Sequence, residues 1–456
     1  MCVKGLRQNT YNACMNLPIT RALGWISISM LYFATAPLVA QESGKDLSSL
    51  VETYRRLHQH PELSGQEEQT ARWLAAELRN LGFQVTEDFG QYESPQLKCY
   101  GVVAVMKNGA GPVVMIRTDL DALPIQEKTG LPYASQVKAT SSAGQEVPVM
   151  HACGHDLHMT CFLGAAQNLA RAREQWRGTL VMIGQPAEET GAGAKAMLKG
   201  GLYTRFPKPD FALALHTAAQ LEAGRVAYCP GPALAGTDSL DVILRGKGGH
   251  GAYPQGTKDP IVLAAQFIMA IQTIVSRQIS PLDSAVVTVG SIHGGTKYNI
   301  IPDEVRLQLT VRQYKPEIRQ QILDSIERIA KGLAQAAGAP EPSIGFGEES
   351  VSATINDPDL TERLAGVWKR TLDESRVTRA DPVMAGEDFS NYSVDGVRSC
   401  LFWLGAVAAG EMRLHETTGK PLPGLHSSEL APDVERAIPT GVEAMTAAAL
   451  ELLRKP

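Results

Sequence analysis

The feature that most constrains the fold is a series of short apolar runs, each followed by polar residues. The first occupies residues 113–116 and is continuously apolar, and similar runs follow at residues 179–183 and 211–215. A continuous apolar run indicates a strand buried on both faces, because a strand with one solvated face alternates apolar and polar residues. Residues with apolar positions at helical spacing separate the runs. The predicted fold class is therefore α/β, with an α/β/α catalytic domain.

The pattern changes near Gly236, which indicates a second domain. From there to residue 350 the order reads strand, helix, strand, strand, helix, strand, the order of an α+β unit with helices on one face of its sheet. Predicted helices at residues 357–372 and 433–453 return the chain to the first domain. Because 456 residues exceed what one core usually organises, we predict a catalytic domain of residues 41–235 and 351–456 with an insert at 236–350.

The first 40 residues have the character of a targeting segment. Lys4, Arg7 and Arg21 precede or flank an apolar run at residues 22–36, which is shorter than the roughly 20 residues that a bilayer span needs. We predict a signal peptide, residues 1–40, cleaved after Ala40, and hence a periplasmic or secreted protein. The alternative is an uncleaved N-terminal membrane anchor.

Charge and cysteine content narrow the function further. The formal net charge of -5 provides no basic field for a nucleic acid, so we expect none as a partner. Removal of the leader leaves an odd number of cysteines, so at least one thiol lies outside any intramolecular disulfide. These cysteines are Cys99, Cys153, Cys161, Cys229 and Cys400.

Groups suited to a hydrolytic metal centre follow several predicted strands and loops. They are Cys153, His155, Glu188, Glu189, His216 and His426. Adjacent Glu188 and Glu189 repel each other unless a cation neutralises one of them, and the other then lies beside metal-activated water. Taken singly, the same residues also fit an acidic solvated loop, a buried thiol beside an imidazole, and an ordinary loop histidine.

Several motifs in a fixed order resemble the amidohydrolase branch of the carboxypeptidase/aminoacylase metallopeptidase family, the group of hippurate hydrolases, N-acyl-amino-acid amidohydrolases and auxin-conjugate hydrolases. The resemblance extends from about residue 57 to the C-terminal helix. The motifs are DLDALP at residues 119–124, HACGHD at 151–156, QPAEE at 185–189, GGHGAYP at 248–254, NIIP at 299–302, EDFS at 387–390 and LHSS at 425–428.

The resemblance implies a site with two divalent metal ions, Mn²⁺ or Zn²⁺, with Ni²⁺ or Co²⁺ as further candidates. The implied metal ligands are Cys153, His155, Glu189, His216 and His426. Glu188 is implied as the general base, and Asp121 as the carboxylate that orients a ligand. A thiolate ligand suits a borderline-soft metal better than magnesium or calcium.

The insert is implied to act as a lid and a dimerisation surface, so a homodimer is expected. His250 lies in a glycine-rich loop and corresponds to a histidine that stabilises the tetrahedral oxyanion, in some relatives from the partner subunit. Asn299 and Arg312 correspond to groups that hold the substrate carboxylate. Tyr298 is bulkier than the usual residue before Asn299, and Thr118 and Leu120 also depart from the family pattern; these changes bear on substrate choice.

Other polar residues near the motifs are excluded from the predicted ligand set. We expect His58, His60 and His158 to be structural. His151 and Asp119 are expected to assist the site without binding metal.

The expected function is hydrolysis of small N-acyl amino acids to a carboxylic acid and a free amino acid. An exported dipeptidase or carboxypeptidase with the same centre is the alternative among enzymes. A non-catalytic metal- or ligand-binding protein is a third possibility, which the presence of Glu188 disfavours.

Overall fold

The fold was obtained as a computed structural model, which describes residues 43–454. The predicted signal peptide, residues 1–40, lies outside the described residues.

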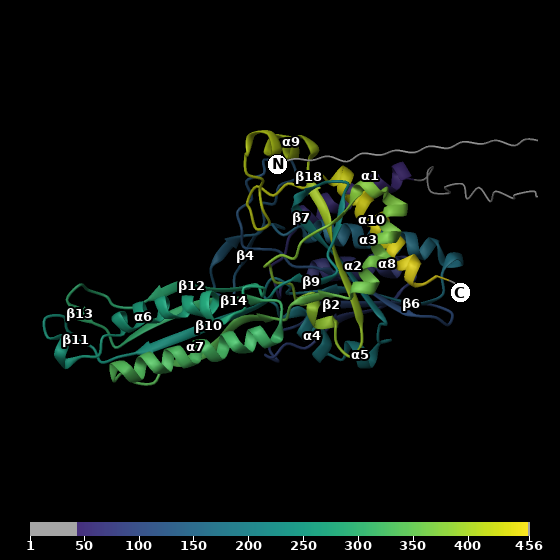
Figure 1. Cartoon of the computed structure of the whole chain (residues 1–456). Coiled ribbons are helices and arrows are strands. Elements are labelled where there is room, and N and C mark those ends of the chain that lie inside the picture. Colours follow the sequence, from purple (N-terminus) through teal and green to yellow (C-terminus); the bar gives the residue numbers. More distant parts are fainter. Residues whose placement is uncertain (1–42, 455–456) are drawn as a thin grey trace, which may run out of the picture. The chain divides into compact units, whose positions relative to one another are not determined.

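An eight-stranded mixed sheet forms the centre of the fold (Figure 1). Its strands, in spatial order, are β1 (Gln84–Phe89), β2 (Gly101–Asn108), β6 (Gly178–Gln185), β3 (Val113–Asp119), β7 (Phe211–Glu222), β18 (Arg398–Val407), β8 (Val226–Tyr228) and β17 (Val377–Arg379). The central strands β6, β3, β7 and β18 run parallel to one another, and β1 and β2 add antiparallel pairs at one edge.

Helices cover both faces of this sheet. One face packs on α1 (Ser43–Gln59), α2 (Glu68–Asn80), α3 (His155–Arg171), α8 (Pro358–Leu372) and α10 (Val434–Leu452). The other packs on α4 (Gly193–Lys199), α5 (Leu202–Arg205) and the 3₁₀ segment η5 (Asp388–Tyr392). Val114 and Ile116 point into the first core and Met115 into the second, so the apolar run in β3 is continuous because both of its faces are buried. The predicted α/β fold class is confirmed.

Strand β18 was not among the strands expected from the sequence. It lies between β7 and β8, with Trp403 opposite His216 of β7. Its residues from Ser399 to Val407 are all buried, and they divide alternately between the two cores. The continuous apolar run at residues 400–404 was the available signal for it.

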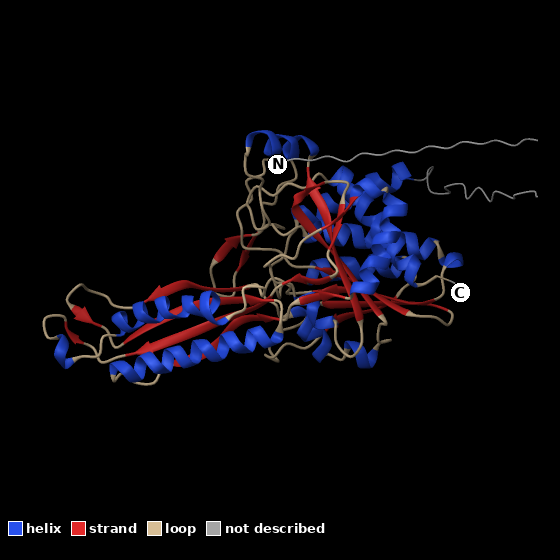
Figure 2. Ribbon diagram, in the orientation of Figure 1, coloured by secondary structure: helices blue, strands red, loops and turns tan. Residues whose placement is uncertain are grey.

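The insert contains a separate four-stranded antiparallel sheet. Its strands, in spatial order, are β12 (Ala285–His293), β14 (Glu304–Gln313), β10 (Gly236–Arg245) and β15 (Ser343–Val351). Two helices, α6 (Pro260–Thr273) and α7 (Pro316–Ala337), share a core with one face of it (Figure 2). In β14, Val305, Leu307 and Leu309 are buried while Arg306 and Gln308 are exposed, as expected of a sheet with one covered face.

Helix α6 continues through a π-helical turn, Ile274–Gln278. Within the described part of the chain, it is the one helix long and apolar enough to cross a membrane by length and composition. Leu263, Phe267 and Ile271 lie in the core of the insert, which accounts for part of its apolar character. Val262 and Met269 are instead 54% and 71% exposed.

The remaining elements are short. They are the hairpin β4 (Lys138–Thr140) and β5 (Glu146–Pro148), the pair β9 (Gly231–Leu234) and β16 (Thr354–Asn356), the pair β11 (Gly249–His250) and β13 (Ile300–Ile301), helix α9 (Ala409–Thr418), and the 3₁₀ segments η1 (Arg173–Gln175), η2 (Pro254–Gly256) and η4 (Glu374–Arg376). Both larger sheets belong to one unit, Gly44–Pro456, so the division into a catalytic domain and a separate insert stays a prediction.

Candidate metal centre

The polar residues that follow the central strands meet at one edge of the large sheet. Strand β6 ends at Gln185, directly before the Glu188–Glu189 pair, and parallel β7 carries His216. Helix α3 begins at His155, after a glycine with a φ of 85°. Because parallel strands end at the same edge of a sheet, this topology collects side chains that are far apart in the sequence.

The five predicted metal ligands form one cluster. Cys153 Sγ lies 3.6 Å from His216 Nε2, and His155 Nε2 lies 3.8 Å from a Glu189 oxygen. The other Glu189 oxygen lies 3.4 Å from His426 Nε2. Ligand atoms of Cys153, His155 and His216 lie within 4.8 Å of one another, and so do those of Cys153, Glu189 and His426. The two overlapping groups share the Cys153 sulfur.

Two of the histidines are oriented by backbone carbonyls. The Nδ1 of His155 lies 2.8 Å from the carbonyl oxygen of Asp121, and the Nδ1 of His216 lies 2.9 Å from that of Thr217. A carbonyl only accepts hydrogen bonds, so Nδ1 carries the proton in both rings. The lone pair of each neutral ring therefore lies on Nε2, which faces the cluster.

The Asp121 carboxylate contacts residues that carry or adjoin the proposed ligands. Its Oδ2 accepts hydrogen bonds from Ser64 Oγ at 2.6 Å and from the backbone N–H of Glu189 at 3.1 Å. Its Oδ1 lies 3.4 Å from His155 Nδ1. One carboxylate thus contacts the histidine on α3 and the loop after β6, the position expected of a group that orients ligands.

Without a bound cation, burial and neighbouring negative charges disfavour the ionised forms of the thiol and the carboxylates in this cluster. Burial raises the pKa of the Cys153 thiol well above its ordinary value, and the Glu189 carboxylate adds to this. Burial likewise raises the pKa of Glu189 to about 7. The pKa of Glu188 is also raised, by burial and then by the carboxylates of Glu387 and Glu189. Cations bound at the cluster would lower these three pKa values instead.

The donor set fits divalent metal ions. The buried atoms His155 Nε2 and Glu189 Oε1 have no hydrogen-bond partner among the described residues, as expected of atoms that bind a metal. A thiol, imidazoles and a carboxylate together suit zinc, manganese or a similar borderline ion.

The loop that carries Glu188 and Glu189 has a constrained backbone. Ala187 adopts a left-handed conformation with a φ of 51°, which costs a non-glycine residue on the order of 1 kcal/mol or more. Its N–H donates to the buried carboxylate of Glu67 at 2.9 Å. A Cβ on Gly193 would lie 1.6 Å from the carbonyl oxygen of Pro186, so that position accepts only glycine.

His426 reaches the cluster from the C-terminal part of the chain. Its backbone N–H donates to the carbonyl of Ala152 at 2.8 Å, and its own φ is 62°. Its side chain is 54% exposed, in contrast to the buried His155 and His216. His426 therefore lies on the solvent side of the cluster.

His158 and Asp119 lie next to the cluster, but their polar atoms are already bonded. The His158 Nε2 accepts from the backbone N–H of Thr217 at 2.7 Å, so its Nδ1 donates to Asp119 Oδ1 at 2.8 Å. The other oxygen of Asp119 accepts from Arg117 at 2.7 Å. This pairing leaves neither His158 nitrogen free for a metal.

Sequence reasoning missed the buried charge network around Arg117. Its guanidinium, 1% exposed, donates to Asp119 at 2.7 Å, Glu387 at 2.8 Å, Asp388 at 3.0 Å and Gln185 at 3.0 Å. An arginine at the end of a fully apolar strand was the available signal, because a buried charge requires partners.

A second buried network was also missed, around His58. Its Nδ1 lies 2.7 Å from Asp156 and its Nε2 lies 3.1 Å from Glu127. Burial alone would lower the pKa of His58, but the hydrogen bonds with the two carboxylates raise it to about 10. The protonated ring joins α1 to the first turn of α3, which starts at the metal-ligand candidate His155.

A cleft of about 720 Å³ opens onto the cluster. Cys153, Glu188, Glu189, His216 and His426 line one part of it, and so does Arg312, whose Nη1 donates to the carbonyl of Met384 at 2.9 Å. Apolar side chains line the rest: Leu221, Leu234, Val351, Val383, Trp403 and Leu425.

The structure does not bring His250 and Asn299 to this cleft. Neither residue lines it. His250 belongs to β11, which pairs with β13 beyond the end of the larger sheet of the insert (Figure 1). The His250 side chain is exposed, and its Nδ1 accepts from the backbone N–H of Ala252 at 3.0 Å, which leaves Nε2 as a potential donor.

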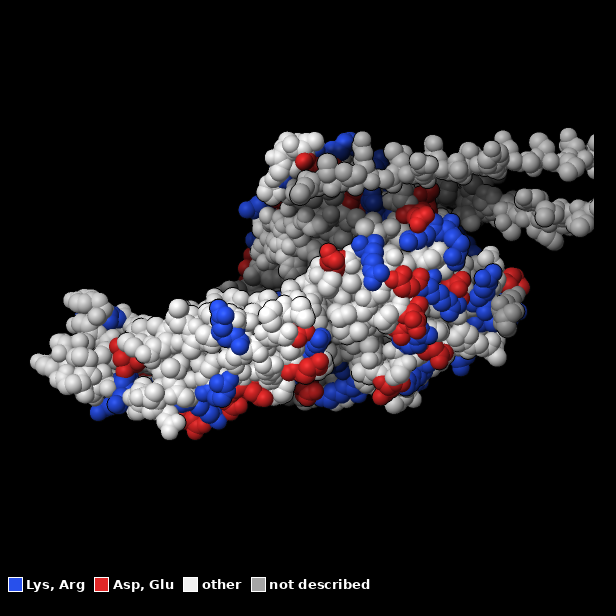
Figure 3. All heavy atoms as spheres, in the orientation of Figure 1, with Lys and Arg blue, Asp and Glu red and all other residues white. Residues whose placement is uncertain are grey.

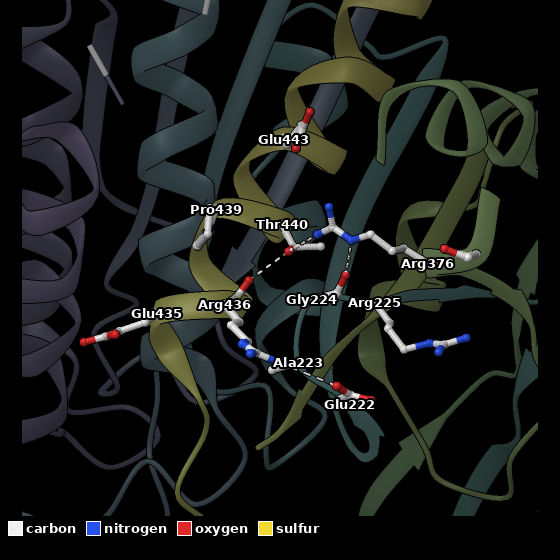
Figure 4. A pocket seen from close by; sticks show the side chains of 11 residues that line it. Glu222, Ala223, Gly224, Arg225, Arg376, Glu435, Arg436, Pro439, Thr440 and Glu443 are labelled. Atoms are coloured by element: carbon white, nitrogen blue, oxygen red, sulfur yellow. Dashed lines mark hydrogen bonds and ion pairs between the residues drawn. The ribbon is translucent and has the colours of Figure 1, made fainter. Parts of the chain in front are cut away.

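A second cavity, of about 540 Å³, lies beside α10 (Figure 4). Two of its arginines are bonded to other residues that line it: Arg376 donates to the carbonyl of Gly224 at 2.6 Å and to Thr440 at 2.8 Å, and Arg436 lies 3.7 Å from Glu222. Among its described lining residues there is no cysteine or histidine, so it lacks the donor set of the first cleft.

On the molecular face drawn in Figure 3, basic and acidic side chains are interspersed. No continuous basic field covers that face, which matches the small negative net charge of -5.

Comparison with known proteins identifies the family. The model of peptidase family M20/M25/M40 matches residues 115–422. The chain is 36% identical to an N-acetylcysteine deacetylase of Bacillus subtilis over 361 residues, 78% of this chain and 88% of that protein. It is 35% identical to thermostable carboxypeptidase 1 of Saccharolobus solfataricus, over 75% of this chain and 82% of that protein. It is 33% identical to the Arabidopsis thaliana protein named IAA-amino acid hydrolase ILR1-like 2, over 83% of this chain and 81% of that protein.

The fold agrees with a solved structure. The Bacillus subtilis YXEP protein, titled a dinuclear metal binding peptidase from the M20 family, superposes with a TM-score of 0.72 and 28% identity, covering 90% of this chain and 99% of that one. The resemblance to the amidohydrolase branch, predicted from the motifs, is confirmed by these relatives. The chain belongs to peptidase family M20/M25/M40.

Proposed function

We propose that the protein hydrolyses the amide bond of small N-acyl amino acids with two divalent metal ions. The observation that carries this proposal is the cluster of Cys153, His155, Glu189, His216 and His426 at the mouth of a cleft that also contains Glu188. Relatives named as a deacetylase of N-acetylcysteine and as a hydrolase of amino-acid conjugates support the same class of substrate.

The five clustered residues would hold the metal ions, with the Cys153 sulfur common to both groups of ligands. Bound ions would polarise the substrate carbonyl and make water at the site a stronger nucleophile at neutral pH. Manganese and zinc both suit this set of sulfur, nitrogen and oxygen ligands.

Glu188 is positioned to move the protons. Its carboxylate lies 3.9 Å from His155 Nε2 and lines the cleft, yet it is not needed to complete the two groups of ligands that contain Cys153. In the proposed reaction it takes a proton from the attacking water and gives it to the leaving nitrogen.

Arg312 and the apolar wall are proposed to select the substrate. The Arg312 guanidinium has one nitrogen bonded to Met384, and the remaining N–H groups match the geometry of a carboxylate. The apolar side chains near Trp403 suit a hydrocarbon or aromatic part of the substrate.

A metallo-carboxypeptidase is the second candidate. The Saccharolobus solfataricus relative carries that name, and Arg312 would hold the free carboxylate of a peptide equally well. A peptidase that recognises short peptides also benefits from a group that binds the free α-ammonium of the peptide. The two candidates are therefore separated by comparing the cleavage of dipeptides with a free N-terminus and dipeptides with an acylated N-terminus.

We also propose that the protein is a homodimer and that His250 acts in the cleft of the partner subunit. Strand β12 is a free edge of the sheet of the insert, and the neighbouring α6 exposes Val262 and Met269. Unpaired edges and exposed apolar helix faces favour association. Dimerisation would supply the oxyanion donor that is missing from the cleft of the single chain.

Export to the periplasm or outside the cell is proposed from the leader at residues 1–40. Mass analysis of the protein recovered from the periplasmic fraction should give a mature chain that begins at Gln41. An intact N-terminus in a membrane fraction would contradict this and favour an anchor.

The proposed activity is tested with the purified mature chain. We expect glycine release from benzoylglycine and amino-acid release from N-acetyl and longer N-acyl amino acids. A chelator should abolish release, and added Mn²⁺ or Zn²⁺ should restore it. Cleavage of free dipeptides without cleavage of N-acyl amino acids would favour the peptidase, and a metal-loaded protein inactive on both panels would contradict the proposal.

A further inference from the structure

We propose that Glu387 contacts the substrate, and that its free carboxylate oxygen, together with Glu188, receives the leaving nitrogen as an ammonium ion. This inference rests on the proposed amidohydrolase function. It adds a substrate-contacting residue that is neither a metal ligand nor the general base.

The two oxygens of Glu387 have different surroundings. Its Oε1 accepts from Arg117 Nη2 at 2.8 Å and from the backbone N–H of Phe389 at 3.0 Å. Its Oε2 has no hydrogen-bond partner among the described residues, although the side chain is 1% exposed. A buried carboxylate oxygen without a donor is costly, so it indicates a place where a ligand donates.

Glu387, which carries the free acceptor, lies at the catalytic cleft. Glu387 lines the cleft beside Glu188 and His216. One oxygen from each of Glu188, Glu387 and Asp388 lies within 4.8 Å of the other two. Two acceptors that share one tetrahedral ammonium, each at a hydrogen-bond length, are separated by roughly 4.6 Å. Glu188 and Glu387 are therefore close enough to accept hydrogen bonds from the same nitrogen.

The two neighbouring carboxylates are not equally available. Asp388 Oδ1 accepts from Arg117 at 3.0 Å and from Gln185 at 2.7 Å, and its Oδ2 accepts from Gln185 at 2.9 Å and from the backbone N–H of Ala194 at 3.0 Å. Asp388 is thus fully bonded inside the protein. Of this pair, only Glu387 offers an acceptor to a ligand.

The reaction forms an ammonium ion. Water adds to the carbonyl carbon, the bond between carbon and nitrogen breaks, and the products are a carboxylate and an amine. Glu188 transfers one proton of the water to the nitrogen, and the second water proton follows from the tetrahedral oxygen, so R–CO–NH–R′ and H₂O give R–COO⁻ and R′–NH₃⁺. Hydrolysis of the corresponding ester releases a neutral alcohol, which needs no such acceptor.

The test compares an amide with its ester. Benzoylglycine and O-benzoylglycolate differ only in the N–H or O at the scissile bond. Glu387→Gln keeps an Oε1 for Arg117 and Phe389 but can place an NH₂ group where the free oxygen lies. We expect kcat/KM for the amide to fall about 10- to 100-fold, the effect of one charge-assisted hydrogen bond, and that for the ester to change less than about 3-fold. Inhibition by the product glycine should weaken, while inhibition by benzoate should not.

Tyr392→Phe is the matched control. The Tyr392 hydroxyl donates to Gln185 at 3.0 Å, so its loss loosens the same network without changing the free oxygen of Glu387. We expect this variant to affect amide and ester equally. Equal losses of both activities in Glu387→Gln would overturn the inference and make Glu387 a support for Arg117 alone. Excess Zn²⁺ gives a further outcome. If it inhibits Glu387→Gln less than wild type, while the ratio of kcat/KM for the amide to that for the ester stays at the wild-type value, the inference is overturned and Glu387 belongs to a metal site.

Wild-type protein separates this inference from the proposed function. If wild type cleaves neither substrate, the proposed function fails. If it cleaves both, the variant decides the role of Glu387. Should Glu387→Gln not fold, glycine and glycolate are compared as inhibitors of wild type: stronger inhibition by glycine is expected, and equal inhibition would overturn the inference.

Discussion

At the scale of single residues, the centre depends on which atom of each side chain remains free. The backbone carbonyls of Asp121 and Thr217 fix the Nδ1 protons of His155 and His216, so that both Nε2 atoms face the cluster. Glu188 is close to these atoms but belongs to the proton-transfer part of the proposed site. Metal binding and proton transfer are therefore expected to be lost separately on substitution.

Cys153→Ala tests the metal ligands. Removal of the shared sulfur should reduce the metal retained after dialysis to less than about half of the wild-type content, because both groups of ligands contain it. Metal per chain is measured by plasma mass spectrometry. Cys161→Ala, an equally buried thiol with its Sγ directed at the carbonyl of Ile438, is the control and should retain normal metal. Equal metal content in the two variants would remove Cys153 from the ligand set.

Glu188→Gln tests the general base. The amide cannot take a proton from water at neutral pH, so kcat should fall by about 10²- to 10⁴-fold. Metal content should stay near the wild-type value. Steady-state kinetics at saturating metal measure the effect, and turnover within a factor of a few of wild type would assign the proton transfer to another group.

At the scale of elements, buried polar pairs hold the helices and loops that carry the site. His58 near the end of α1 contacts Asp156 of α3 and Glu127 of the loop after β3. Hydrogen bonds of Glu67 to Gly65 and Ala187 join the start of α2 to the loop after β6. These contacts cross the fold and lie directly behind metal-ligand candidates.

His58→Gln should lower the free energy of unfolding by about 3 kcal/mol at neutral pH, because it leaves two buried carboxylates without their cation. The pKa of His58 is raised from 6.5 to about 10 in the folded protein, so its contribution is complete below pH 6.5 and is lost as the pH rises toward 10. The pKa values of Asp156 and Glu127 are lowered by the hydrogen bonds with His58 despite burial, so their contribution is lost in acid.

Denaturant unfolding from pH 5 to pH 10 measures this profile. The difference between wild type and His58→Gln should be largest near pH 5 to 6.5 and should shrink toward pH 10. His60→Gln is the control, since the side chain of His60 is exposed and hydrogen-bonds to the backbone oxygen of Arg56 at 2.8 Å, and it should change the stability by less than about 0.5 kcal/mol. A difference independent of pH would show that His58 is not the buried cation.

Gly193→Ala tests the loop that carries the glutamate pair. The added Cβ would overlap the carbonyl of Pro186, so the loop must shift and amidase activity should fall at least about tenfold. Gly332→Ala in α7 is the control: nothing lies within 4 Å of the new Cβ, and the helix should gain about 0.5–1 kcal/mol. Activity and thermal unfolding are measured for both. Wild-type activity in Gly193→Ala would mean that the glutamates do not depend on this backbone.

At the scale of the whole molecule, the cleft of one chain contains the proposed base and proposed ligands, but His250, the predicted oxyanion donor, is not among its lining residues. His250 lies on β11, away from the residues that line the cleft. The free edge of β12 and the exposed apolar residues of α6 offer a surface for a second copy.

Mixing inactive variants tests the dimer. If His250 acts in the partner cleft, each heterodimer of Glu188→Gln and His250→Ala has one complete site, so random mixing should restore about a quarter of wild-type activity. Met269→Glu should disrupt the dimer in sedimentation and lower activity with it. A mixture without recovered activity, or an active monomer, would contradict the action of His250 across subunits.

Much of the architecture follows from local pattern. The continuous apolar run in β3 predicts a sheet that is buried on both faces, and the order of elements in residues 236–350 predicts a sheet with helices on one face. Both sheets are observed. Strand β18 was missed although residues 400–404 carry the same kind of apolar run, and its pairing with β7 was not predictable because sequence distance gives no information about pairing. The Arg117 network was missed because its members are far apart in the sequence: Arg117 of β3 donates to Glu387, which lies 270 positions later.

The sequence by itself determined the family, since the motifs occur in a fixed order, and it supplied the candidate donor residues, since ligand chemistry resides in side-chain type. Tertiary structure alone decided which nitrogen of each histidine is free and that Arg117 binds three carboxylates. It also decided that one oxygen of Glu387 has no partner and that His250 lies outside the cleft. These are properties of contacts between distant segments, and a buried polar atom acquires its role from the neighbours that folding provides.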